Sequence, residues 1–298
     1  MNQNNKPSIA ISTAENLAFF NKNGYLIVEN FLSDEEIESI RKSARQIVDD
    51  FDMEALSVFT TEEQSQHTNR YFLESGSNVS CFFEPDALDE KGKLKRDKHL
   101  SVNKIGHAMH DLLPEWQRVS YNKSLCDFAK SIGHQKPAIV QSQYIYKQPQ
   151  IGGRVHPHTD STFIHTKPLS CLGAWMALED ADQSNGCLLA IPGSHKWPLQ
   201  NQFVRMGDHS GTELILTDVE RVEWKEEELI PLEVKKGALV LLHGSVVHAS
   251  SLNSSDRSRH AFVLHLADLA SEWSGENWLQ RPADFPFRAT EDGLGMES

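Results

Sequence analysis

Hydrophobic and polar positions follow two different patterns along the chain, and the change comes near residue 137. Before it, apolar residues mostly recur at helical spacing. The clearest helical segment follows Ser33 and has one apolar stripe, formed by Ile37, Ile40, Ala44, Ile47 and Val48. Ser33 and Glu36 have the spacing of a capping box, in which each side chain bonds the other residue's backbone N–H. The pattern therefore predicts a helix that begins directly after Ser33.

Three further elements are predicted in this N-terminal half. The apolar run 25–28 follows an Asn-Gly turn and is typical of a strand. Ser101 stands where it would cap a helix over 102–112, which Pro114 would end. Another helix is predicted over 115–132, ending at Gly133.

From residue 137 onward, short apolar runs are separated by Gly, Pro, Asn and Ser. Strands are predicted at 138–146, 172–178, 187–191, 238–242 and 260–266. Many short strands with Gly-rich turns favour an antiparallel sheet that closes or folds on itself. We therefore expect an α+β chain with a mainly β core, a jelly-roll or cupin-like barrel flanked by N-terminal and mid-chain helices.

The expected organisation is a single domain over 1–298. Its helical flank would cover about 12–133 and its barrel core about 137–270. The stretch 197–228 has no clear periodicity and becomes acidic towards its end. We expect it to form an insertion or a lid.

Composition narrows the class of partner. The 298 residues include 42 acidic and 29 basic ones, a net charge of −13. Phosphate-rich partners need a basic surface, so this excess argues against nucleic acid and against anionic membranes. No apolar run approaches the ~18 residues of a membrane span, and residues 1–10 lack the apolar core of a secretory signal. We expect a cytoplasmic protein that acts on a small molecule and has no obligate protein partner.

The four cysteines are scattered along the chain without CxxC spacing. Neither a zinc ribbon nor a disulfide framework is therefore expected, and a reducing compartment is the default.

The segment His158-Thr159-Asp160 is the strongest candidate for metal chemistry. In an extended chain residues i and i+2 face the same side, so His158 and Asp160 can bind one metal ion. His248 ends a later apolar strand and its polar loop, and a barrel would bring it opposite this pair. Two histidines and one carboxylate on one face of a metal suit non-haem Fe(II) and leave three positions open. We predict His158, Asp160 and His248 as metal ligands and catalytic residues.

Arg259 follows His248 by eleven residues and opens the next predicted strand. A guanidinium group there can bind a carboxylate through a bidentate fork. 2-Oxoglutarate fits this arrangement, because it chelates iron at one end and carries a free carboxylate at the other. The residues thus indicate an oxygenase that uses Fe(II), 2-oxoglutarate and O₂. Arg257, two residues earlier on the same strand face, is the competing candidate.

Several neighbouring residues have less specific interpretations. His156 would compete as a ligand in a regular strand, but Pro157 is expected to take it out of register. His195 is expected to stabilise its turn by a hydrogen bond, and His243 is expected to be a core histidine or one that supports a ligand, rather than a ligand itself. His265 is expected to be a wall or core residue, with a role in substrate binding as the alternative. Trp273 and Trp278 are expected to pack the C-terminal segment.

Two other functional classes remain open from the residues alone. The same two histidines and carboxylate could hold Zn²⁺ in a hydrolase on a cupin-like barrel. Arg259 argues against that class, because hydrolysis needs no remote carboxylate clamp. The chain could also be a non-enzymatic module that senses 2-oxoglutarate or a metal.

Several segments together resemble the phytanoyl-CoA dioxygenase family of Fe(II)/2-oxoglutarate oxygenases. The resemblance runs from about residue 16 to 286 and is carried by His158-Thr159-Asp160, Asn185-Gly186-Cys187-Leu188, Ile191-Pro192-Gly193-Ser194-His195, His248 and Arg259. It implies a double-stranded β-helix, iron bound by the two histidines and Asp160, and hydroxylation of a small organic or acyl substrate with release of succinate and CO₂.

The resemblance also implies a cosubstrate pocket. Arg259 would be the main partner of 2-oxoglutarate, and Ser250 would hydrogen-bond its distal carboxylate. Lys104 and Trp175 would line the pocket. Gln143 stands where a relative has a methionine, and its amide can pack against a dicarboxylate. The resemblance leaves open whether the substrate is an acyl-CoA thioester or a small polar metabolite.

Overall fold

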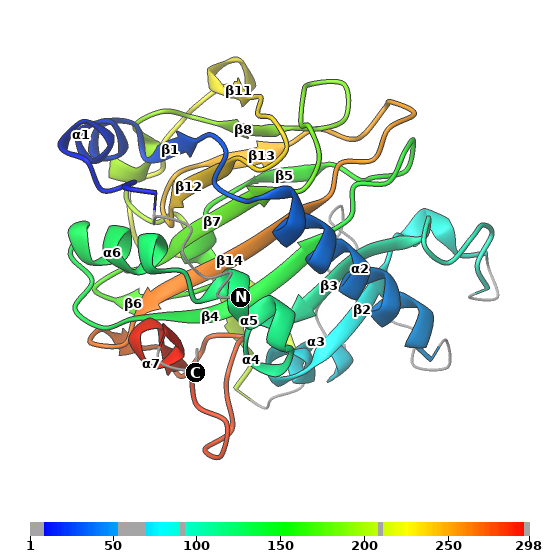
Figure 1. Ribbon diagram of the computed structural model, residues 1–298. Coiled ribbons are helices and arrows are strands. Elements are labelled where there is room, and N and C mark those ends of the chain that lie inside the picture. Colours follow the sequence, from blue (N-terminus) through cyan, green and yellow to red (C-terminus); the bar gives the residue numbers. More distant parts are fainter. Residues whose placement is uncertain (1–8, 53–69, 90–92, 208–210, 295–298) are drawn as a thin grey trace.

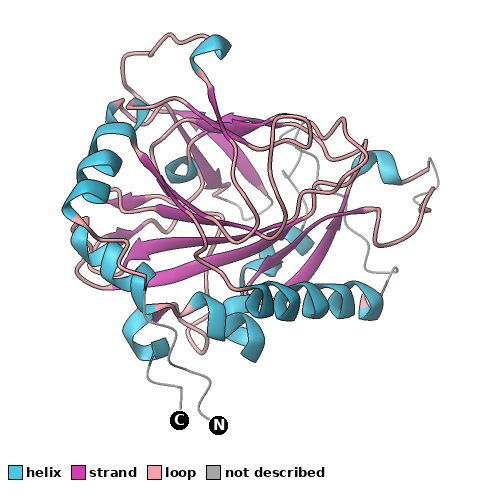
Figure 2. Cartoon of the chain, turned by 45° about the horizontal axis from the view of Figure 1, so that its top comes forward, coloured by secondary structure: helices cyan, strands magenta, loops and turns pink. Residues whose placement is uncertain are grey.

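The computed structural model describes residues 9–52, 70–89, 93–207 and 211–294. Within these residues an eight-stranded sheet lies between a layer of helices and a four-stranded sheet (Figures 1 and 2). Every strand pair in both sheets is antiparallel. The structure is therefore mainly an antiparallel β core with a few helices.

The large sheet has the strand order β1 (Tyr25–Val28), β12 (Leu239–His243), β7 (Leu172–Ala177), β14 (Ala261–Asp268), β4 (Pro137–Ile145), β3 (Val102–His107) and β2 (Val79–Phe83), with β16 (Arg288–Ala289) beside β4. The small sheet has the order β11 (Ile230–Leu232), β8 (Leu188–Ala190), β13 (His248–Ser250) and β5 (Val155–His158). Two short pairs complete the strands: β9 (Asn201–Arg205) with β10 (Thr212–Leu216), and β6 (Thr166–Lys167) with β15 (Glu272–Trp273).

The helices are α1 (Ala14–Asn23), α2 (Asp34–Asp50), α3 (Arg70–Glu74), α4 (Met109–Leu112), α5 (Pro114–Ser120), α6 (Lys123–Ser131) and α7 (Thr290–Leu294). Single 3₁₀ turns are η3 (Ser75–Ser77), η4 (Pro85–Ala87), η5 (Asp160–Thr162), η6 (Ser194–Lys196) and η7 (Glu226–Glu228). Helices α2, α5 and α6 lie over one face of the large sheet (Figure 1). In the part of the chain that the structure describes, no helix has both the length and the apolar character of a membrane span.

Strand β14 shows how one strand serves both sides of the large sheet. All eight of its residues are buried. Phe262, Leu264 and Leu266 belong to the core shared with the helices, whereas Ala261 and Val263 belong to the core between the sheets. Side chains alternate between faces along a strand, so a central strand covered on both faces is apolar throughout. The face of β14 that carries Val263 also lines the candidate site.

The capping box and the strand predictions are confirmed. The Ser33 backbone N–H donates to Glu36 Oε2 at 2.7 Å, and Ser33 Oγ accepts from the Glu36 backbone N–H at 3.3 Å. The predicted strand at 25–28 is β1, and the five predicted later strands correspond to β4, β7, β8, β12 and β14.

The helix predicted over 102–112 is wrong. Residues Val102–His107 form β3, and only Met109–Leu112 are helical. All six residues of β3 are buried, because β3 lies between β2 and β4 and has cover on both faces. Burial on both sides removes the alternation that identifies a strand, and the remaining apolar spacing resembled a helix.

The helix predicted over 115–132 is two helices. Helix α5 ends at Ser120, and α6 begins at Lys123. Asn122 separates them, because its side-chain oxygen accepts from the Ser124 backbone N–H at 2.9 Å and caps α6. An N-cap residue takes an extended backbone, so the helical path is broken there.

The stretch 197–228, predicted as an insertion or lid, contains the β9–β10 pair and the turn η7. The N-terminal part, predicted as a helical flank, also supplies β1, β2 and β3 to the large sheet. The described helices and strands thus form shared cores rather than a separate helical unit.

Candidate active site

Two strands of the small sheet bring the predicted metal ligands together. His158 is the last residue of β5, and His248 is the first residue of β13 directly opposite it. Asp160 follows at the start of η5. Its Oδ1 lies 3.8 Å from His158 Nε2 and 3.5 Å from His248 Nε2. Among the described residues, these three form the group whose ligand atoms all lie within 4.8 Å of one another.

Both histidine rings are oriented by backbone carbonyls. His158 Nδ1 lies 2.8 Å from the carbonyl oxygen of His156, and His248 Nδ1 lies 3.1 Å from that of Val246. If each Nδ1–H donates to its carbonyl, each Nε2 keeps its lone pair towards Asp160. Burial, together with the neighbouring His248, lowers the pKa of His158 to about 4, so its ring is neutral near pH 7. The His158 ring therefore has the neutral form that metal ligation requires.

Asp160 is buried but held as a carboxylate. Burial alone raises its pKa, but the nearby rings of His248 and His265 outweigh this effect, and the net pKa lies below its usual value. The strand beneath it makes room: a Cβ added to Gly173 of β7 would lie 2.9 Å from Asp160 Oδ2. The site thus offers two imidazole nitrogens and one carboxylate oxygen, the donor set that suits Fe(II).

Arg259, just before β14, lines the same cavity as the metal-site residues. The residue is 2% exposed, and its guanidinium carbon lies 5.3 Å from the ring centre of Trp175. Its Nε donates to the Gly186 carbonyl at 3.1 Å, while its buried Nη1 has no partner among the described residues. Burial lowers its pKa to about 10, so it remains a cation at neutral pH. A buried, incompletely paired guanidinium is suited to an anionic ligand.

The other residues of the implied cosubstrate pocket line the same cavity, whose volume is about 300 Å³. Ser250 ends β13, and its buried hydroxyl has no partner among the described residues. Lys104 lies in the middle of β3, where burial lowers its pKa to about 7. Gln143 comes from β4 and Trp175 from β7. The structure therefore brings all eight predicted site residues to one cavity.

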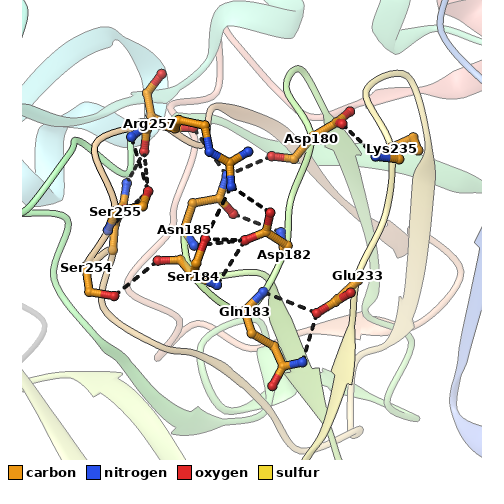
Figure 3. A network of polar contacts seen from close by, with 12 residues as sticks. Asp180, Asp182, Gln183, Ser184, Asn185, Glu233, Lys235, Ser254, Ser255 and Arg257 are labelled. Atoms are coloured by element: carbon orange, nitrogen blue, oxygen red, sulfur yellow. Dashed lines mark hydrogen bonds and ion pairs between the residues drawn. The ribbon is translucent and has the colours of Figure 1, made fainter.

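Arg257 lies outside this cavity, at the surface. Its Nη2 donates to Asp182 Oδ2 at 2.7 Å and to Ser184 Oγ at 3.2 Å. Figure 3 shows this network, which joins the loop after β7 to the loop before β14. Of the two candidate arginines, only Arg259 lines the cavity with the metal-site residues.

The less specific histidines also have defined places. His156 is exposed at the cavity mouth and contributes its backbone carbonyl to His158. His195 Nε2 lies 3.1 Å from the Asn21 carbonyl, consistent with its predicted structural hydrogen bond. His265 does lie in the wall, but its Nε2 is also 3.3 Å from Asp160 Oδ1.

Sequence reasoning missed part of the cavity wall. Trp278 was expected only to pack the C-terminal segment, but it lines the cavity and stacks on Phe72 with ring centres 4.5 Å apart. Glu84 also lines the cavity, and burial raises its pKa to about 7. These residues come from segments far from the metal-binding motifs, and no local spacing links them.

The fold is similar to that of two solved structures. The crystal structure of the non-heme alpha ketoglutarate dependent carbocyclase SnoK is similar, with a TM-score of 0.62 and 17% identity, covering 92% of this chain and 96% of that one. The structure of EctD from S. alaskensis with 2-oxoglutarate and 5-hydroxyectoine is also similar, with a TM-score of 0.59 and 19% identity, covering 91% of this chain and 84% of that one. These similarities define the fold class.

Sequence comparison identifies the family. The family model "Phytanoyl-CoA dioxygenase (PhyH)" matches residues 20–261. The chain is 42% identical to the phytanoyl-CoA dioxygenase of Arabidopsis thaliana over 270 residues, 90% of this chain and 94% of that protein. It is 40% identical to phytanoyl-CoA dioxygenase domain-containing protein 1 of Bos taurus over 289 residues, 94% of this chain and 98% of that protein. The chain belongs to the phytanoyl-CoA dioxygenase family and is a 2-oxoglutarate-dependent non-haem iron oxygenase.

Proposed function

We propose that this protein hydroxylates a small organic or acyl substrate and couples the reaction to conversion of 2-oxoglutarate and O₂ into succinate and CO₂. The observation that carries the proposal is the placement of two distinct anchors in one cavity. His158, Asp160 and His248 could hold a metal ion, and the buried Arg259 has an Nη1 with no partner among the described residues. A zinc hydrolase would need only the first anchor.

The residues present fit the iron and the cosubstrate. The two Nε2 atoms and the Asp160 carboxylate would hold the metal, and Arg259 with Ser250 would hold the distal carboxylate of 2-oxoglutarate. Within the part of the chain that the structure describes, neither Arg259 Nη1 nor Ser250 Oγ has a partner, which supports this assignment because buried polar atoms are normally hydrogen-bonded. Bound Fe(II) supplies the redox chemistry, in which one oxygen atom of O₂ enters succinate and the other enters the product.

The protein's own contribution is orientation and exclusion of water. Trp175 lies beside Arg259 and lines the cavity, and Lys104 and Gln143 would contact the cosubstrate from β3 and β4. The substrate side is mostly apolar, with walls that include Phe72, Phe163, Phe203, Leu214 and Trp278. An apolar wall suits a substrate that is uncharged near the C–H bond to be hydroxylated.

We also propose that the fold is a double-stranded β-helix. The large and small sheets face each other across the core that holds the site, which supports this assignment. We propose one catalytic domain over 1–298 and a lid or insertion at 197–228, because Phe203 and Leu214 from that stretch line the cavity. The four cysteines are all buried and free, which supports a reducing, cytoplasmic location.

The decisive experiment measures succinate formation with Fe(II), ascorbate, O₂ and 2-oxoglutarate, alone and with a panel of acyl-CoA thioesters and small polar metabolites. We expect slow succinate formation without substrate and faster formation with a true substrate, matched by a hydroxylated product. If 2-oxoglutarate and iron bind but no condition yields succinate, the protein is a sensing module and the proposal fails.

A further inference from the structure

The carboxylate of Asp160 lies against a specific pair of residues in the large sheet. Gly173 of β7 and His265 of β14 are directly opposite each other in the β7–β14 pairing. Gly173 leaves the space that Asp160 Oδ2 occupies, since an added Cβ would lie 2.9 Å from that oxygen. His265 reaches the other oxygen, with its Nε2 3.3 Å from Oδ1. One carboxylate oxygen of Asp160 therefore lies against Gly173, and the other lies beside the His265 nitrogen.

His265 is suited to donate to this carboxylate. The residue is 8% exposed, and its Nδ1 is buried without a partner among the described residues. The Asp160 contact thus favours the tautomer with hydrogen on Nε2, because an anionic oxygen can only accept. The ladder between β14 and β4 also shifts register directly after His265. Such irregularities re-aim side chains near active sites.

His265 does not belong to the metal-binding group itself. That group, within the described residues, consists of His158, Asp160 and His248. His265 is the nearest of the three imidazoles to Asp160 Oδ1, at 3.3 Å against 3.5 and 3.8 Å. His265 thus lies against the carboxylate of a proposed ligand while standing outside the group of described residues that could hold one metal ion.

We propose that His265 and Gly173 are positioning residues that fix the Asp160 carboxylate for metal binding. His265 holds the carboxylate by a hydrogen bond, and Gly173 allows it to lie close to β7. The inference deepens the proposed function and rests on it, because it assumes a metal at His158, Asp160 and His248. Partners behind a metal ligand commonly change metal affinity by 10- to 100-fold.

The test measures Mn(II) affinity of the full chain by titration calorimetry, for the wild type, His265→Leu, His265→Gln and Gly173→Ala. We expect His265→Leu to weaken Mn(II) binding roughly 10- to 100-fold. His265→Gln keeps an N–H near the position of Nε2 and should recover most of the affinity. Gly173→Ala should weaken binding because its methyl group displaces Oδ2.

A matched control separates positioning from packing. His107 is another buried histidine of the large sheet; its Nδ1 lies 2.8 Å from Ser75 Oγ, and its ring packs against Phe72 and Trp278 rather than against Asp160. His107→Leu should leave Mn(II) affinity within about twofold in the folded protein. The visible spectrum of bound Co(II), which reports coordination geometry, should change in His265→Leu but not in His107→Leu.

The possible results separate a failure of the proposed metal site from a failure of the positioning role. If the wild type binds no Mn(II), or Asp160→Ala binds it as well as the wild type, the proposed metal site is wrong. If the wild type binds Mn(II) and folded His265→Leu binds it equally well with an unchanged Co(II) spectrum, only the positioning role is wrong. Equal loss in His265→Leu and His107→Leu would also overturn it, because the effect would then be general packing.

Discussion

Arg257 and Arg259 are two residues apart and carry the same charge, yet they lie in opposite environments. The Arg257 side chain is 51% exposed and pairs with Asp182 at 2.7 Å in a surface network (Figure 3). Arg259 is 2% exposed, has the Gly186 carbonyl as a partner, and lies in the cavity of the metal-site residues. Water can accept hydrogen bonds from the Arg257 N–H groups that have no protein partner, whereas the N–H groups of the buried Arg259 depend on partners inside the protein or on a bound ligand.

The comparison shows that a charged side chain has a larger energetic effect when it is buried than when it is exposed. An exposed ion pair contributes about 0–1 kcal/mol, since water competes for both partners. A buried charge without a full set of partners is costly, so its retention points to a ligand that completes the set. The two regions are also connected. Asp182 and Gly186 belong to the same loop, so the surface network borders the carbonyl that holds Arg259 Nε.

The largest effect is expected inside the cavity. His158→Ala, Asp160→Ala and His248→Ala should each reduce Fe(II)-dependent succinate formation to the background without enzyme, because each removes one of the three proposed metal ligands. Circular dichroism should show that the variants remain folded, since the three residues lie at a cavity rather than in the apolar core. Full activity in a variant would remove that residue from the metal site.

The second effect compares the two arginines directly. Arg259→Met should raise the 2-oxoglutarate concentration needed for half-maximal succinate formation by about two orders of magnitude, which corresponds to roughly 3 kcal/mol. Arg257→Met, the matched control, should change this concentration less than threefold. Metal affinity should stay the same in both variants, since neither changes a ligand. A larger effect for Arg257→Met than for Arg259→Met would show that Arg257, and not Arg259, binds 2-oxoglutarate.

The third effect concerns stability and contrasts two carboxyl groups. Burial raises the pKa of Glu84 from 4.5 to about 7, whereas hydrogen bonds from Ser184 and Arg257 lower the pKa of the half-buried Asp182. Between about pH 4.5 and 7 the folded protein retains a proton on Glu84 that the unfolded chain releases. The free energy of unfolding therefore falls as pH rises through this range.

Glu84→Gln should remove this dependence, because its amide is neutral at every pH and can still accept from Asn103. Relative to the wild type, the variant should gain on the order of 2 kcal/mol between pH 5 and pH 8. Urea unfolding at both pH values measures the change. Parallel pH profiles for the two proteins would show that Glu84 titrates normally in the fold.

The smallest effect is expected at the surface. Asp182→Asn breaks the exposed pair with Arg257 and should cost about 1 kcal/mol or less in urea unfolding. Because the loop also supplies the Gly186 carbonyl, a measurable rise in the 2-oxoglutarate requirement would show that the network positions Arg259. An unchanged requirement would show that the two regions act independently.

Local patterns in the sequence were sufficient for many elements of the fold. The Ser33–Glu36 capping box and the apolar stripe after it define α2, because both depend only on residues a few positions apart. The same holds for the short strands between Gly-rich turns. It fails for β3, where burial on both faces hides the alternation, and at Asn122, whose capping bond divides one expected helix into two.

The sequence by itself indicated the candidate chemistry of this protein. The i, i+2 spacing of His158 and Asp160 is a local property that predicts a metal-binding pair, and the residue types of His248 and Arg259 suit a third ligand and a carboxylate clamp. Only the tertiary structure decided which arginine faces the cavity, that Trp278 and Phe72 form part of its wall, and that His265 and Gly173 lie against Asp160. Those relations join strands far apart in the chain. Strand pairing and burial set them, and no spacing within one segment encodes either.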